Sequence, residues 1–164
     1  HPKMGWRCYS NEDLNEKNID WEKLRIENLI PEFGKELSSD SYILEYGFEK
    51  LNGVDFKKGC YVGQEVTART HYRGLVKRRI APFAVTGAGC APGAAITSGD
   101  RALGKVLSTV CGPEGGMCLA AMKLSDLHRL QDVGNNVEID GATARLALPD
   151  WMLPLPSPAR TDST

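Results

Sequence analysis

Short apolar runs separated by glycine-rich turns dominate the second half of the chain. Residues 79–85, 104–110 and 117–122 each have the length and composition of a β-strand. Residues 136–139 and 143–148 flank Asp140-Gly141, a dipeptide typical of a two-residue hairpin turn. Residues 87–99 and 111–116 are rich in glycine and are expected to be turns. This pattern predicts a small antiparallel β-barrel or sandwich over residues 75–150.

The first half of the chain has helical and loop patterns instead. Residues 20–29 predict a helix that Pro31 ends, and residues 31–41 have the composition of a loop. Residues 64–72 contain neither Gly nor Pro and predict a second helix, and residues 124–130 add one or two helical turns. The opening stretch through Tyr9 is expected to be extended. The fold class is therefore α+β, with one unit over residues 1–74, the barrel over 75–150 and a proline-rich, disordered tail over 151–164.

Composition and charge exclude several classes of protein. Hydrophobic residues make up 41% and charged residues 25% of the 164 residues, which excludes wholesale disorder. The net charge of -1 argues against a nucleic-acid binder held by charge alone. No apolar run approaches the roughly 20 residues of a membrane span. Locally, residues 57–79 hold 7 Lys or Arg and a single acid, Glu65, so this window is either a solvated basic face or a site for an anionic ligand.

The cysteines and the first residue give two further expectations. None of the 5 cysteines forms a C-x-x-C pair, so we expect a reducing compartment, no disulfide framework and no structural zinc site. Four of them are expected to act as small buried hydrophobic residues: Cys8, Cys90, Cys111 and Cys118. The chain begins with His1 instead of Met, so we expect a fragment or a processed chain whose upstream part is missing, together with any targeting segment.

The remaining cysteine lies in the stretch with the most chemistry, residues 57–65, which read KKGCYVGQE. Gly59 and Gly63 bracket Cys60 and allow a tight loop immediately before the second predicted helix. The free N–H groups of a helix N-terminus and the basic residues nearby favour the thiolate form of a cysteine. Cys60 is therefore the candidate nucleophile, and the alternative is a buried cysteine in a glycine turn.

The same stretch resembles the K-G-C-[FY]-x-G-Q-E signature of the YgfZ family, which is followed here by Ala68-Arg69 and Tyr72-Arg73-Gly74. These are folate-binding proteins that support iron–sulfur cluster assembly and repair, and they are related to the aminomethyltransferase (T-protein) of glycine cleavage. Supporting matches are LRIE at residues 24–27, IPEFGKEL at 30–37, GDRALGKVLS at 99–108 and Leu119-Ala120. The resemblance implies a partial T-protein-like folate-binding domain followed by the barrel.

The resemblance also suggests which residues bind the folate. Glu27 matches the acid that faces the pterin, and a carboxylate can accept two hydrogen bonds from pterin N–H donors. Glu45 matches a second acid of the family, and Arg25 is expected to pair with either acid or to cover the ring face. The remaining candidates are aromatic residues for stacking and arginines for the glutamate tail of folate: Tyr61, Tyr72, Arg69 and Arg73. Each also has an ordinary structural or solvent-facing interpretation, and His71 has no clear role.

The function that the resemblance implies is a folate-binding accessory protein for iron–sulfur cluster assembly or repair, with Cys60 as a reactive thiol or transient cluster ligand. The expected cofactor is tetrahydrofolate, and the expected partners are assembly or client proteins, because one cysteine cannot hold a cluster alone. A folate-dependent aminomethyltransferase and a factor linked to tRNA modification are the alternatives. Neither membrane association nor direct nucleic-acid binding is expected, self-association is possible, and the compartment is the bacterial cytoplasm or the mitochondrial matrix.

Overall fold

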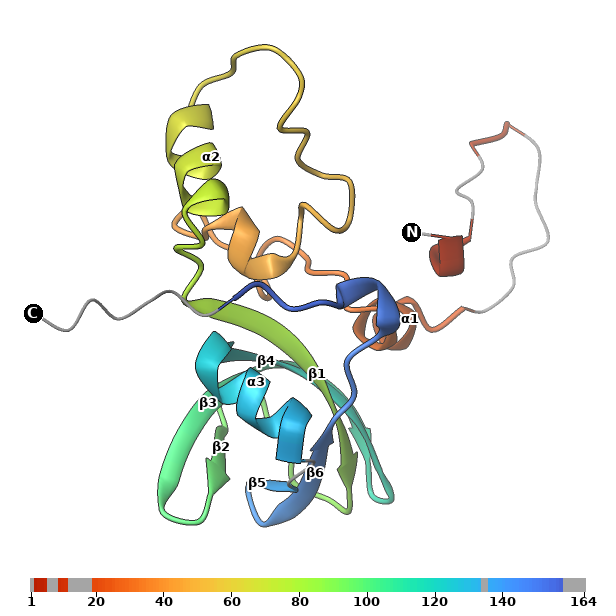
Figure 1. Cartoon of the computed structure of the whole chain (residues 1–164). Helices are drawn as coiled ribbons and strands as arrows, with labels where there is room; N and C mark the ends of the chain where they lie inside the picture. The colour runs from red at the N-terminus through yellow and green to blue at the C-terminus, as the bar shows by residue number, and fades with distance from the viewer. Residues whose placement is uncertain (1, 6–8, 12–18, 134–135, 158–164) are drawn as a thin grey trace, which may run out of the picture.

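Six strands in the described part of the chain close into one antiparallel barrel (Figure 1). The computed structural model describes residues 2–5, 9–11, 19–133 and 136–157. Around the barrel the strand order is β1-β4-β3-β2-β5-β6, and β6 pairs with β1 to complete the circle. The strands are β1 (Arg78–Thr86), β2 (Ala95–Ser98), β3 (Arg101–Gly112), β4 (Gly115–Lys123), β5 (Val137–Ile139) and β6 (Ala142–Leu146). The predicted antiparallel barrel is confirmed.

The barrel interior is filled by inward-facing side chains and covered by one helix. Ala81, Phe83 and Val85 alternate along β1 and join a single buried cluster. Helix α3 (Leu124–Val133) adds Leu124, Leu127 and Leu130, which follow helical spacing on one face, to the same cluster. The long strand β3 departs from regular register with β2 and with β4, and such irregularities let a strand bend around a small barrel.

The predicted hairpin turn is confirmed, whereas β2 was not predicted. Asp140 and Gly141 have φ angles of 48° and 81°, the left-handed pair that a two-residue hairpin favours. Strand β2 lies inside residues 87–99, where the glycine content indicated only turns. It has four residues, and it is extended because it pairs with β3 on one side and β5 on the other. The pairing depends on residues that are far apart in the chain, so the local sequence of β2 carries little of the pattern of a strand.

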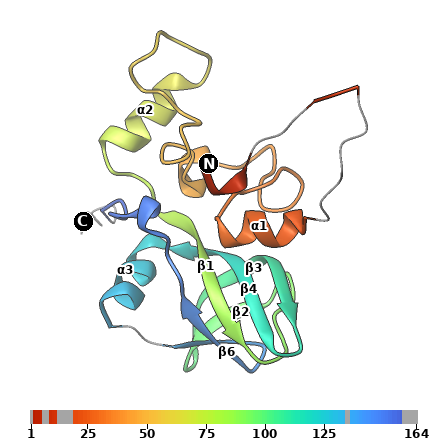
Figure 2. The same ribbon diagram turned by 90° about the vertical axis from the view of Figure 1, so that its right-hand side faces the viewer.

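The N-terminal segment packs on the outside of the barrel. Helix α1 (Trp21–Glu27) is shorter than predicted, because Asn28 caps it and Leu29 turns into the left-handed region with a φ of 56°. Ile26 and Leu29 lie in a second buried cluster, together with Ile80 and Leu119 of the barrel wall. Figure 2 shows α1 lying along the barrel while α2 (Gln64–Tyr72) stands apart from it. The short helices η1 (Pro2–Met4) and η2 (Ile43–Tyr46) complete this segment.

No strand is present among the described residues before β1, where only an isolated bridge joins Phe33 and Leu37. The T-protein-like domain therefore stays a prediction. Among the helices of the described residues, none combines the length and the apolar character that crossing a membrane requires.

The expectation of a disordered tail from residue 151 does not hold for its first seven residues. Helix η3 (Asp150–Met152) brings the Met152 side chain into the cluster beneath α1, where it is fully buried. Leu155 is buried in the cluster of the barrel interior. Proline content suggested disorder, but apolar side chains between the prolines find partners on the barrel. Residues 158–164 lie outside the described residues.

A buried arginine joins the N-terminal segment to the barrel. Arg79 of β1 is fully buried, and its guanidinium donates hydrogen bonds to the Leu44 carbonyl and the Glu49 carboxylate. Gly47 lies against this contact with a φ of 78°, and a Cβ there would lie 3.3 Å from Met152 Sδ. Because a buried charge is tolerated only when it is paired, Arg79 holds residues 44–49 in place against the barrel.

We expect Arg79→Ala to lower the free energy of unfolding by about 3–5 kcal/mol, since it leaves the Glu49 carboxylate without its buried partner. Chemical denaturation monitored by circular dichroism measures this loss. Arg78→Ala is the matched control, because Arg78 is the neighbouring residue of β1 and is exposed. A loss for Arg79→Ala no larger than for Arg78→Ala would contradict the anchoring role.

Candidate functional site

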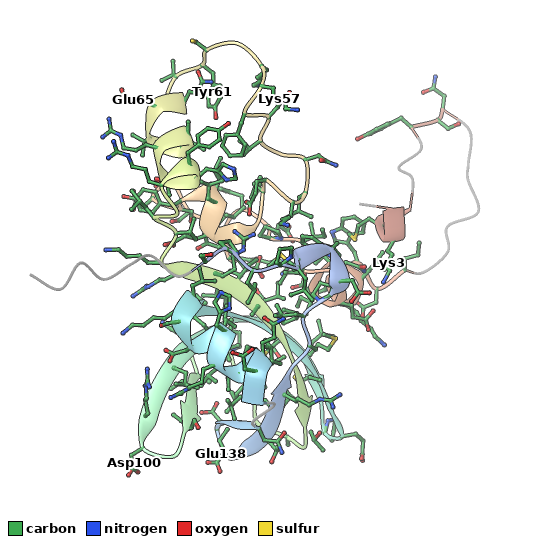
Figure 3. All side chains as sticks on the ribbon, viewed as in Figure 1. Lys3, Lys57, Tyr61, Glu65, Asp100 and Glu138 are labelled. Atoms are coloured by element: carbon green, nitrogen blue, oxygen red, sulfur yellow. The ribbon has the colours of Figure 1, made fainter. Side chains whose placement is uncertain are left out.

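Cys60 lies in an exposed loop at the end of the molecule that is farthest from the barrel. Figure 3 shows Lys57, Tyr61 and Glu65 together at this tip, opposite Asp100 and Glu138 on the barrel turns. Cys60 is a free, exposed cysteine. The alternative of a buried cysteine in a glycine turn is therefore wrong, whereas the reactivity of the thiol stays a prediction.

The local sequence explains the shape of this loop. Gly63 has a φ of 84° and caps the N-terminus of α2, a conformation that favours glycine. Helix α2 begins at Gln64 and ends at Tyr72, as the absence of Gly and Pro predicted. The Thr67 hydroxyl donates a 3.2 Å hydrogen bond back to the Gly63 carbonyl, and Asp55 accepts one of 2.8 Å from the Lys57 backbone N–H. These bonds shape both ends of the loop that carries Cys60.

Aromatic rings join the start of the loop to α2. The His71 imidazole stacks on Phe56 with a centroid distance of 4.0 Å, and Tyr72 meets the same imidazole edge-on. His71, which had no role from the sequence, thus helps to hold the loop against the helix. Lys58 places its ammonium 5.2 Å from the centre of the Tyr61 ring, in cation–π range. An open cavity of about 520 Å³ is lined by Asn52, Val54, Asp55, Phe56, Lys57, His71 and Tyr72.

The basic residues of α2 lie on its exposed surface. Arg69 forms an ion pair with Glu65, the one acid of the basic window, four residues earlier on the helix. Arg73 is exposed at the C-terminal cap, and no residue of α2 is buried. Both arginines are accessible to an anionic ligand, and binding of a folate tail by either of them stays a prediction.

Glu27 lies at a different cavity, between α1 and the barrel. This cavity has a volume of about 380 Å³, and Glu27 and Lys23 face each other there at 3.9 Å. Three glycines form part of its barrel wall, and a Cβ on Gly112 would meet nothing within 4 Å. The half-exposed carboxylate of Glu27 and the ammonium of Lys23 give this cavity a hydrogen-bond acceptor and a hydrogen-bond donor. The glycine content of residues 111–116 predicted only a turn, and no local pattern marked Lys23 or this wall as part of a cavity.

Arg25 is the centre of a buried ion-pair network. Its guanidinium donates to both Glu36 carboxylate oxygens at 2.9 Å, to Glu22 Oε2 at 2.9 Å and to the Ile30 carbonyl at 3.3 Å. The Glu32 carboxylate lies 3.1 Å from Arg25 Nε. Arg25 and Glu36 are both buried, so the IPEFGKEL stretch folds around this one guanidinium.

The expected pairing of Arg25 with Glu27 or Glu45 is therefore wrong. Arg25 is oriented by carboxylates of its own segment, and its bond to Glu22 lowers the pKa of that carboxyl group. With only 1% of its side chain exposed, it does not cover the face of a ligand ring. The sequence placed an arginine beside the acids but did not show which acids it meets.

Glu45 lies in η2 and is half-buried. Burial raises the pKa of the Glu45 carboxyl group, and the positive charge of Arg78 opposes this rise.

The residues predicted for one site lie in two places. Glu27 is on α1 against the barrel, whereas Cys60 is in the loop that precedes α2 (Figure 1). The cavity of Glu27 and the cavity beside the Cys60 loop share no lining residue. A continuous site with the thiol beside the pterin is not formed by the described residues. These residues also include no group of three or more His, Cys, Asp or Glu side chains placed to hold a metal ion.

Comparison with known proteins adds a family match for the barrel. Residues 77–154 match the family model described as CAF17, C-terminal beta-barrel domain, which agrees with the observed closed barrel.

Similar curated proteins carry one common name. The chain is 31% identical to the mitochondrial iron-sulfur cluster assembly factor IBA57 of Mus musculus over 164 residues, covering 91% of this chain and 44% of the mouse protein. The IBA57 homolog of Dictyostelium discoideum is 51% identical over 63 residues, covering 38% of this chain and 15% of that protein. The chain thus matches less than half the length of these relatives. In broad terms, the names agree with the resemblance to the YgfZ family.

We expect Glu45→Gln to raise the free energy of unfolding at pH 7, by less than about 1 kcal/mol because the side chain is only half-buried. A raised pKa means that the folded protein binds the proton more tightly than the unfolded chain does. The carboxylate therefore costs stability as pH rises from the ordinary pKa of about 4.3 through the raised value. Denaturation at pH 7 and about pH 3 measures this, and the gain should vanish at the lower pH.

Glu138→Gln, an exposed residue of β5, is the control and should change stability by less than about 0.5 kcal/mol at both pH values. An equal gain for Glu45→Gln at both pH values would contradict the burial argument.

Proposed function

We propose that this chain serves in an accessory protein for the assembly or repair of iron–sulfur clusters, with Cys60 as the residue that contacts the cluster. The observation that carries the proposal is the free, exposed thiol of Cys60 at the tip of a glycine-bracketed loop. The names of the mouse and Dictyostelium relatives support the same class of function. Because those relatives are named as mitochondrial proteins, we propose the mitochondrial matrix as the compartment.

The surroundings of Cys60 suit transfer of a cluster between proteins. A cluster usually has about four protein ligands, so one thiolate needs ligands from a partner protein, a second copy or a small thiol. Val62 is fully exposed two residues away, and Val66 of α2 is also exposed, so a partner can approach the loop and bury apolar surface there. Lys57 and Lys58 precede Cys60 in the loop, and their positive charge favours the approach of an anionic cluster.

We also propose that the cavity of Glu27 binds the pterin of tetrahydrofolate. The carboxylate would accept hydrogen bonds from the pterin N–H and amino groups, and the open space beside Gly112 leaves room for part of a flat ring. Because Cys60 does not line the cavity of Glu27, folate in this proposal is a ligand of the barrel side and not a reactant at the thiol. No observation favours the aminomethyltransferase or the tRNA-linked alternative, and both stay predictions.

Cells that lack their own relative of this protein test the role of Cys60. We expect the gene that encodes the chain to restore the activity of an aconitase-type cluster enzyme in these cells. Cys60→Ser should reduce the restored activity at least several-fold. Cys111→Ser is the matched control, because Cys111 is a half-buried thiol of the barrel and should leave the activity unchanged. Full activity with Cys60→Ser, at equal protein levels, would refute the role of this thiol.

Titration calorimetry with tetrahydrofolate tests the pterin cavity. We expect the protein encoded by the full gene to bind, and Glu27→Gln to weaken binding by about 10- to 100-fold, the range for a lost charged hydrogen bond. Glu138→Gln in β5 is the matched control and should bind as the unchanged protein does, because Glu138 is exposed and does not line this cavity. Equal binding by Glu27→Gln would exclude Glu27 from the site, and no binding by the unchanged protein would remove folate from the proposal.

A further inference from the structure

Three cysteines belong to the barrel interior. Cys90 and Cys118 are buried members of its cluster, as predicted, whereas Cys111 is half-buried and packs against that cluster. Cys8 lies outside the described residues. The cavity beside the Cys60 loop is different, because several polar and aromatic side chains line it and no ligand is assigned to it.

One part of this cavity's lining is aromatic. The rings of Phe56, His71 and Tyr72 pack against one another, with centroid distances of 4.0 Å for Phe56 and His71 and 5.1 Å for His71 and Tyr72. Tyr72 nevertheless keeps 72% of its surface exposed to solvent. An exposed aromatic ring that its neighbours hold in place offers a preorganised face on which a flat ring can stack.

Polar side chains line the cavity along the loop from Asn52 to Lys57. Asn52 has a φ of 59°, in the left-handed region that asparagine tolerates, and Asp55 and Lys57 follow it in the loop. Asp55 Oδ1 accepts the 2.8 Å hydrogen bond from the Lys57 backbone N–H, so the carboxylate is oriented and its Oδ2 can accept from a ligand. Five residues extend over at most about 18 Å, so one small molecule can meet an amide, a carboxylate and an ammonium along this loop.

We propose that this cavity binds a purine mononucleotide. Its volume of about 520 Å³ lies within the usual range for small-molecule sites, about 300–1,000 Å³. The aromatic rings favour a flat ligand, and the polar loop favours one that also carries hydroxyl and anionic groups. A phosphate is such an anionic group, and it suits the basic window of residues 57–79. The site uses neither the Cys60 thiol nor the cavity of Glu27, so it does not depend on the proposed function.

Each part of a nucleotide has a matching group in the cavity. The base stacks on the exposed Tyr72 ring, and the Asn52 amide pairs with the edge of adenine, where a donor and an acceptor lie side by side. The Asp55 carboxylate accepts a hydrogen bond from a ribose hydroxyl. Lys57 is exposed, and its flexible side chain brings an ammonium to the phosphate at the open side of the cavity. A single lysine suits a monophosphate better than a longer phosphate chain.

Saturation-transfer NMR on the folded full chain tests the base contacts, with adenosine 5′-monophosphate (AMP) and uridine 5′-monophosphate (UMP) as probes. We expect saturable AMP binding with transfer to the adenine ring protons, and several-fold weaker binding of UMP. Tyr72→Ala should weaken AMP binding by about 5- to 150-fold, the range for a lost base–aromatic stack, whereas Tyr72→Phe should keep it. Tyr42→Ala is the matched control, because Tyr42 is an exposed aromatic residue that does not line the cavity.

Lys57→Gln tests the phosphate contact without touching the aromatic packing. It should weaken AMP binding several-fold and leave the binding of adenosine unchanged, because adenosine has no phosphate. Lys58→Gln is the control, since Lys58 is the neighbouring lysine and does not line the cavity.

Four results would each overturn the proposal. They are no saturable AMP binding, equal affinity for AMP and UMP, full AMP binding by folded Tyr72→Ala, or an equal loss of AMP and adenosine binding with Lys57→Gln. Circular dichroism checks that each variant is folded. Failure of this test would leave the proposed function unaffected, because Cys60 and Glu27 are unchanged in every variant.

Discussion

The position of the N-terminal segment against the barrel depends on the hydrogen bonds of the buried Arg79 guanidinium. The Arg79 side chain extends from strand β1, and its guanidinium donates hydrogen bonds to the Leu44 carbonyl and the Glu49 carboxylate of the N-terminal segment. A charge in an apolar interior has a large desolvation cost, which only a fixed partner offsets. The position of residues 44–49 therefore follows from the barrel, and with it the starting point of the loop that carries Cys60.

A second guanidinium organises the segment before that point. Arg25 forms ion pairs with Glu22, Glu32 and Glu36. The polar stretch after α1 therefore has a defined backbone path, although it has neither strands nor a large core. Two arginines thus hold together a region with little regular structure. In the sequence, charged residues of this part of the chain look the same whether they stabilise the fold or bind a ligand. Burial in the structure shows which of them stabilise the fold.

The candidate binding and reactive side chains lie in three separate places in the molecule. The tip loop exposes one thiol, the groove between α1 and the barrel holds a carboxylate, and the barrel interior contains three thiols. An exposed thiol can meet a second protein, whereas a buried thiol is reached only by small molecules.

The sequence by itself determined the elements whose signals are local. Asp140-Gly141 predicted its hairpin because the left-handed turn favours those residues, the glycines around Cys60 predicted a tight loop, and the absence of Gly and Pro after Gly63 predicted α2. Strand β2, the ordered residues 151–157 and the partners of Arg25 depend on contacts between distant segments, and no local pattern encodes them.

The same distinction applies to the candidate sites. A signature motif identified Cys60, because a motif is a property of neighbouring residues. Only the tertiary structure decided that Glu27 lies at a different cavity from the one beside the Cys60 loop, and that Cys90, Cys111 and Cys118 contribute to the same barrel-interior cluster. The physical reason is that barrel closure sets the distances between residues far apart in the chain, and those distances follow from strand register and packing.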